Sequence, residues 1–164
     1  MLPSVRNGII GSMQDDGGFD DEEQALGVIR SAESRLGEAR FGGGWIDRVN
    51  PNLTYIGIAA VDPAQSDIEA ILALPHAPRW AISIAVVRFS RAELIGFYEH
   101  ADPPQNGACS SIGWDPRLNR VVVRLDRLDE ETVSYFRARI PSEALQILVE
   151  PGGWATAYTD LLPE

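Results

Sequence analysis

The sequence predicts an α+β fold of two small lobes, each a three-stranded sheet with one helix, preceded by an N-terminal helix. The first observation is a repeat, since residues 45–89 and 112–149 share the order strand, turn, strand, helix, strand. The second is its spacing, because in each copy an aspartate expected to open a helix follows a turn asparagine by ten positions. These pairs are Asn52 with Asp62 and Asn119 with Asp129. The third is a hydrophobic content of 45%, which suffices for packed cores.

The N-terminal part is expected to be a leader followed by a helix. Residues 1–18 are rich in Gly, Asp and Ser without a sustained apolar period, so we interpret them as a flexible leader. The helix is expected over 19–40, starting at Asp20 or Asp21, because aspartate accepts amide hydrogens of the first turn. Gly42-Gly43-Gly44 then predicts the end of the helix and a sharp turn.

The first lobe is expected over residues 41–100. Leu53–Val61 is apolar on both faces, which indicates a strand in the centre of its sheet. Asp62 is expected to cap the next helix, with Pro63 in its first helical position. The segment from Trp80 to Phe89 predicts the third strand of this lobe.

A connecting helix is expected to close the first lobe. Ser90 and Glu93 form the pattern of a capping box, in which each side chain satisfies a backbone amide of the other. Residues 101–110 follow and are rich in Pro, Gly and Ser, so we expect a hinge between the lobes there.

The second lobe is expected over residues 111–150. Its middle strand alternates apolar and mostly charged positions, which predicts one face in the core and one in solvent. The alternating sets are Val121, Val123 and Leu125 against Arg120, Val122 and Arg124. Val133, Phe136 and Ile140 are expected on the buried side of the helix, and Leu145, Ile147 and Val149 in the last strand.

Charge and composition narrow the classes of partner. The net charge is −10, with 24 acidic residues against 14 basic ones, all of them Arg. Such a surface repels phosphate backbones, so we expect no nucleic-acid partner. No apolar run approaches the ~20 residues of a membrane span, so we expect no membrane partner. The leader also lacks the apolar core of a secretion signal, which predicts a cytoplasmic protein, or an extracellular one if the sequence is a trimmed secreted precursor.

The polar clusters predict no catalytic residue, no cofactor and no metal. His100, Asp102 and either Cys109 or Ser110 supply the side-chain types of a nucleophilic triad, but sequence spacing alone does not orient a base on a nucleophile. We therefore interpret them as residues of a solvated loop. The acidic residues before position 24 come in adjacent pairs, whereas a calcium loop needs alternating ligands.

The C-terminal tail, residues 151–164, is too short to form a core of its own. Its apolar residues are Trp154, Tyr158, Leu161 and Leu162. They are expected either to pack back on the chain's own sheet or to form a peptide that adds to the sheet edge of a partner. The sequence leaves both interpretations open.

Three stretches together resemble the pro regions of secreted bacterial serine proteases of the alpha-lytic protease and streptogrisin type. They are Phe41–Arg48 (FGGGWIDR), Val87–Leu94 (VRFSRAEL) and Trp114–Val123 (WDPRLNRVVV). Their order and spacing agree with the family from about residue 20 to about residue 150, which is most of the chain. The resemblance implies a two-lobed domain without enzymatic activity that helps a chymotrypsin-fold serine protease to fold and then inhibits it.

The resemblance also implies which residues would bind. By position, Leu145, Ile147 and Val149 would lie in a sheet that pairs with a hairpin of the protease. The tail with Trp154, Tyr158, Leu161 and Leu162 would enter the active-site cleft, although no family motif matches it residue for residue. The alternative is a cytosolic protein-interaction module that uses the same fold for another partner, including a homodimer formed through edge strands.

Overall fold

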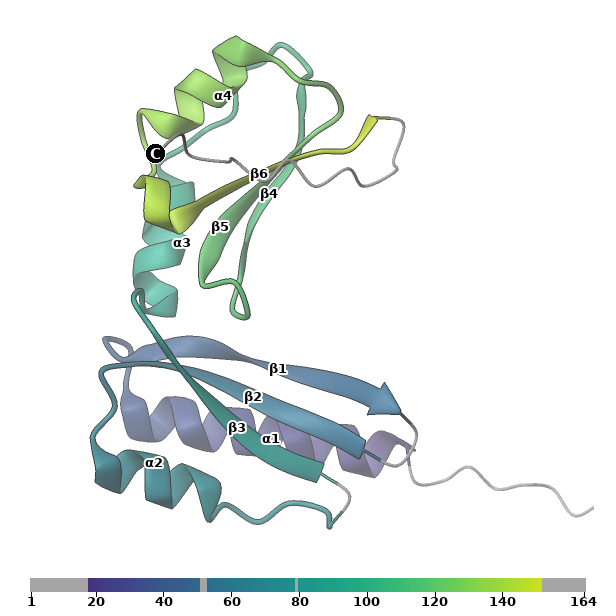
Figure 1. Cartoon of the computed structure of the whole chain (residues 1–164), viewed down its shortest axis with the longest axis vertical. Coiled ribbons are helices and arrows are strands. Elements are labelled where there is room, and N and C mark those ends of the chain that lie inside the picture. Colours follow the sequence, from purple (N-terminus) through teal and green to yellow (C-terminus); the bar gives the residue numbers. More distant parts are fainter. Residues whose placement is uncertain (1–17, 51–52, 79, 152–164) are drawn as a thin grey trace, which may run out of the picture.

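The computed structural model describes residues 18–50, 53–78 and 80–151. Figure 1 shows two lobes stacked along the long axis, each containing one three-stranded sheet and its own helices. The predicted α+β fold, with two lobes and an N-terminal helix, is confirmed.

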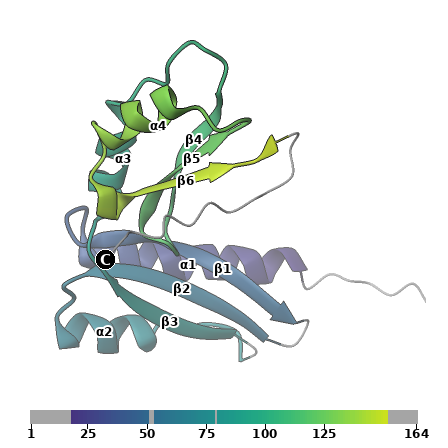
Figure 2. The same ribbon diagram turned by 45° about the horizontal axis from the view of Figure 1, so that its top comes forward.

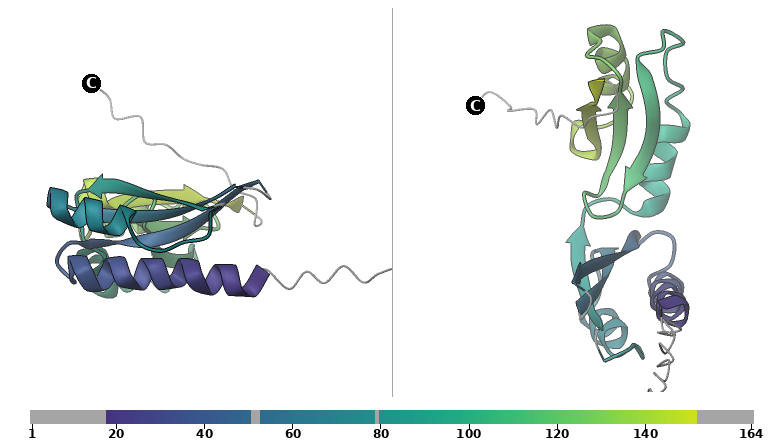
Figure 3. Two further views of the ribbon diagram at one scale, coloured as in Figure 1. Left: turned by 90° about the horizontal axis from the view of Figure 1, so that it is seen from below. Right: turned by 90° about the vertical axis from the view of Figure 1, so that its right-hand side faces the viewer.

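The first lobe has one helix before its sheet and one helix inside the repeat. In chain order its elements are α1 (Gly18–Leu36), β1 (Phe41–Asn50), β2 (Leu53–Val61), α2 (Gln65–Leu72) and β3 (Trp80–Val87). The strand order is β1-β2-β3, with β1 antiparallel and β3 parallel to β2. Both helices contribute to the core on one face of the sheet, and Figure 3 shows α1 along that side.

The second lobe repeats this topology. Its elements are α3 (Arg91–Glu99), β4 (Cys109–Asp115), β5 (Arg120–Leu125), α4 (Glu130–Arg137), the 3-10 helix η1 (Ser142–Ala144) and β6 (Leu145–Val149). The strand order is β4-β5-β6, again with an antiparallel hairpin and a parallel third strand. The sequence repeat is therefore a repeat of hairpin, helix and strand.

The connecting helix α3 belongs to the second lobe. Its Leu94 is fully buried in the second core, where Phe97 also packs. Its start agrees with the sequence, since the Ser90 hydroxyl accepts from the Glu93 amide and the Glu93 carboxylate accepts from the Ser90 amide. The chain thus passes between the lobes at residues 88–90, instead of at the hinge expected over 101–110.

Gly42-Gly43-Gly44 does not form the expected turn, because it lies inside β1. Helix α1 ends at Leu36, and Gly37, with φ of 73°, makes the turn out of it. The glycines allow close approach of other side chains: a Cβ on Gly43 would come 2.6 Å from Cβ of Pro116, and one on Gly44 would come 2.6 Å from Ile29. Tertiary packing, and not turn formation, explains the glycine run.

The two aspartates of the repeat have different roles. Asp129 caps α4, because its side chain accepts from the Thr132 amide. Asp62 does not cap α2: it has a left-handed φ of 42°, and the helix begins at Gln65 after Ala64, without a side-chain cap. Only the second copy therefore follows the predicted capping chemistry.

One asparagine is central to the contact between the two lobes. Asn119, in the β4–β5 turn, is 8% exposed and has a left-handed φ of 52°. Its Oδ1 accepts from the Arg88 and Phe89 amides at 3.2 and 2.9 Å, and its Nδ2 donates to the Phe89 carbonyl at 2.7 Å. This side chain satisfies the main chain where it crosses from one lobe to the other.

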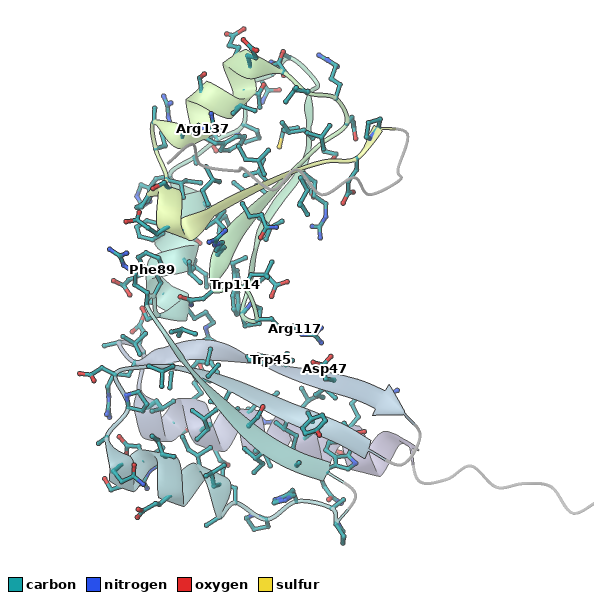
Figure 4. All side chains as sticks on the ribbon, in the orientation of Figure 1. Trp45, Asp47, Phe89, Trp114, Arg117 and Arg137 are labelled. Atoms are coloured by element: carbon teal, nitrogen blue, oxygen red, sulfur yellow. The ribbon has the colours of Figure 1, made fainter. Side chains whose placement is uncertain are left out.

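The same hairpin also rests on β1, as Figure 4 shows for Trp114 and Arg117. Arg117 pairs with Asp47 at 2.6 Å and donates to the Ile46 carbonyl at 3.3 Å. The Trp114 ring lies so close to Gly43 that a Cβ there would come 2.8 Å from it. We call these contacts, together with those of Asn119, the interlobe joint.

A carboxylate on α2 ties the helices of the first lobe together. Asp67 accepts from Arg35 at 3.1 Å and from Arg40 at 2.7 Å. The hydrogen bond from Arg40 is the main cause that holds the pKa of Asp67 below its ordinary value of 3.8. The paired form therefore adds stability above the ordinary pKa, and this contribution is lost as the pH falls through the lowered pKa.

We predict that Asn119→Ala lowers the free energy of unfolding by about 2 kcal/mol, because it leaves partly buried main-chain groups unpaired and places alanine at a positive φ. Urea unfolding followed by circular dichroism measures this. Asn119→Gly is the control, since glycine relieves the backbone strain and retains only the loss of hydrogen bonds. An alanine variant as stable as the native chain would contradict the role of the interlobe joint.

We predict that Asp67→Asn lowers the midpoint of urea unfolding at neutral pH and flattens its decline in acid, because the amide no longer gains from ionisation. The measurement is the unfolding midpoint over a series of pH values from neutral to well below the ordinary Asp pKa of 3.8, because the contribution of Asp67 is lost below that value. Arg40→Gln should produce the same flattening from the other side of the pair. An unchanged acid profile in both variants would exclude Asp67 as a source of the pH dependence.

Candidate protein-binding edge

The two sheets have four edge strands, and they differ in how well they are protected. β1 carries register shifts at both ends, and the second lobe's hairpin packs on it. β4 carries a register shift between Cys109 and Ser111 and packs beside α3. β3 and β6 pair in unbroken parallel register with their inner neighbours. Within the described residues, neither has a strand on its outer side.

The β6 edge, the outer margin of Leu145–Val149, is anchored by its own side chains. Leu145 and Val149 are 9% and 8% exposed, and Ile147 packs against the second core. These are the three strand residues predicted to bind a partner. Since their side chains face the core, the strand offers a partner its main-chain N–H and C=O groups.

The side of β6 away from the helices presents different residues, Gln146 and Leu148, which are partly exposed. Leu148 lies in register with Arg124 of β5, and Arg124 pairs with Glu150 at 3.3 Å.

The predicted solvent face of β5 is correct for the arginines but wrong for Val122, which is 4% exposed in the central strand. Gln146 and Leu148 were missed as candidate contact residues, although the period-two alternation of the strand could have indicated them.

The predicted tail residues Trp154, Tyr158, Leu161 and Leu162 lie outside the described residues. Pro151, two residues after the end of β6, is the last described position. Any binding role of the tail therefore stays a prediction from the sequence.

Two of the polar residues considered for catalysis, His100 and Cys109, lie beside main-chain carbonyls. The Nδ1 of His100 lies 2.7 Å from the Gly96 carbonyl, and the Sγ of Cys109 lies 3.6 Å from the Ser111 carbonyl. Burial raises the pKa of the Cys109 thiol above its ordinary value of 9.0, which opposes formation of a nucleophilic thiolate. Among the described residues, no group of three or more His, Cys, Asp or Glu side chains is arranged to hold a metal.

Two comparisons with known proteins give no family assignment: no protein-family model and no curated protein matches the chain. In the part of the chain that the structure describes, no helix is both long enough and apolar enough to cross a membrane. The candidate site therefore rests on the geometry of the β6 edge.

We predict that Cys109 reacts with iodoacetamide at neutral pH more slowly in the folded chain than in the chain unfolded by urea, because its raised pKa reduces the thiolate fraction. The rate should keep rising with pH beyond 9.0, the ordinary thiol value. His100→Ala should leave the rate unchanged, since that ring is bonded to Gly96. A folded chain that reacts as fast as the unfolded one would refute this.

Proposed function

We propose that this chain is a non-enzymatic protein-binding domain that engages a chymotrypsin-fold serine protease, as a folding helper and as an inhibitor. The observation that carries the proposal is the β6 edge, a regular edge strand with an unpaired outer margin in the described structure. The resemblance of three sequence stretches to protease pro regions supports the choice of partner.

The physical argument begins with the rigidity of the edge. Leu145 packs in the second core and Val149 is buried at the other end of the strand, so its main chain is held in an extended conformation before a partner arrives. When a partner's extended segment pairs with this strand, the domain loses little conformational entropy, because its own strand is already ordered. A preformed edge can thus select a β-hairpin of a partner.

The same property explains a role in folding. Barrels built from distant strands fold slowly, because loop closure costs entropy before the pairings form. A template that pairs with one hairpin of such a chain would stabilise a partly formed barrel, and after folding the same pairing would keep the two proteins together. The tail, which follows β6 in the sequence, is the segment we propose to reach the active-site cleft.

We predict that the purified chain inhibits a bacterial protease of the alpha-lytic type and raises the activity recovered when that protease refolds. Both are measured with a chromogenic peptide substrate. Removing residues 152–164 should weaken inhibition more than it weakens recovery on refolding, because the cleft contact is assigned to the tail. No effect of the full chain on either measurement would overturn the proposal and favour another protein partner.

We predict that Gln146→Lys weakens inhibition about tenfold, because a charged side chain at a sheet edge hinders strand addition. Circular dichroism establishes that the variant is folded. Leu128→Lys is the matched control, because Leu128 is 54% exposed and lies in the loop before α4, outside the strands. Equal inhibition by the two variants would exclude the β6 edge as the binding surface.

A further inference from the structure

The other open margin, the β3 edge, consists of the outer side of Trp80–Val87. Figure 2 shows β3 at the margin of the first lobe's sheet, with β2 on its inner side. Its eight residues, WAISIAVV, include no charged residue, no proline and no glycine. Natural edge strands are usually protected by charged residues, by proline or by bulges. The β3 edge has none of these in the described structure.

The exposure of its side chains also indicates an incomplete surface. Val86 is 70% exposed, the highest value among the exposed large hydrophobic side chains of the described residues. Ile82 and Ile84 pack against the first core but are only partly buried. A further strand beside β3 would cover these three β-branched side chains on the helix side of the sheet.

The order of residues in β3 indicates that the added strand is β3 of a second copy of the chain. The five residues Ala81–Ile82–Ser83–Ile84–Ala85 read the same in both directions about Ser83. In a two-fold symmetric dimer, each residue of one strand faces a residue of the identical strand running the other way. Centred on Ser83, this arrangement places Ala81 opposite Ala85 and Ile82 opposite Ile84 of the second copy.

Steric and electrostatic factors agree with this register. Directly opposite residues of an antiparallel pair lie on the same face, so Val86 would pack beside Trp80 of the second copy. No like charges would meet along the paired strands, even though each chain carries a net charge of −10. Ser83 is exposed on the face away from the helices, where two small hydroxyl side chains meet without a clash.

We infer that the chain forms a two-fold dimer through its β3 edges. The two three-stranded sheets then form one continuous sheet, in which the two β3 strands pair antiparallel and the two-fold axis passes at Ser83. The occupant is a second copy of this chain, because the palindrome matches β3 with itself. The inference does not depend on the proposed protease partner, since β6 belongs to the other sheet.

A charge-pair experiment tests both the dimer and its register. Ser83→Asp and Ser83→Arg each place like charges opposite one another at the two-fold axis, so each should raise the dimer dissociation constant at least about tenfold. A mixture of the two variants should recover dimers, because opposite charges then meet. Sedimentation velocity over a dilution series of the full chain measures all three samples.

Ser111→Asp is the matched control, since Ser111 is also an exposed serine in an edge strand, on the other sheet. It should dimerise like the native chain. A native chain that stays monomeric across the series would overturn the inference, as would a Ser83→Asp variant that dimerises unchanged. Weakened single variants without recovery in the mixture would overturn the register centred on Ser83.

Discussion

The structure depends on how a buried asparagine satisfies the main chain between the two lobes. Residues 88–90 have left the first sheet and have not yet entered α3, so two of their amides need partners from elsewhere. Asn119 supplies them with one oxygen, and its amide nitrogen returns a hydrogen bond to Phe89. Asn119 lies in the turn of the β4–β5 hairpin, and the same turn contacts β1 through the pair of Arg117 and Asp47 (Figure 4).

Repetition of one topology accounts for the two open margins. In each lobe the hairpin provides two antiparallel strands, and the helix that follows returns the chain beside the second of them. The third strand is then always outermost, because the crossover places it on the side away from the first strand. The two outer strands differ in length and exposure: β6 is short and buried at both ends, whereas β3 is longer and carries the exposed Val86.

The sequence predicted the elements whose signals are local and missed those set by tertiary packing. Alternation marked β5, and the Ser90 capping box marked the start of α3, because both patterns act within a few residues. The glycines of β1 are required by Pro116 and Ile29, which are distant in the sequence. For the candidate site, the strand Leu145–Val149 was predicted, but the inward orientation of its side chains depends on the core of the second lobe.

The position of α3 has a consequence for how this architecture can be taken apart. Although α3 follows β3 in the sequence, it packs in the second core. The boundary between the lobes is therefore confined to the short segment 88–90. A recombination event that exchanged one lobe between related proteins would have to cut there. It would also have to preserve the side-chain pairs across that border, in which Arg117 contacts Asp47 and Arg91 contacts Glu33. Inheritance of the two halves as independent modules is therefore restricted by the side chains that meet between the lobes.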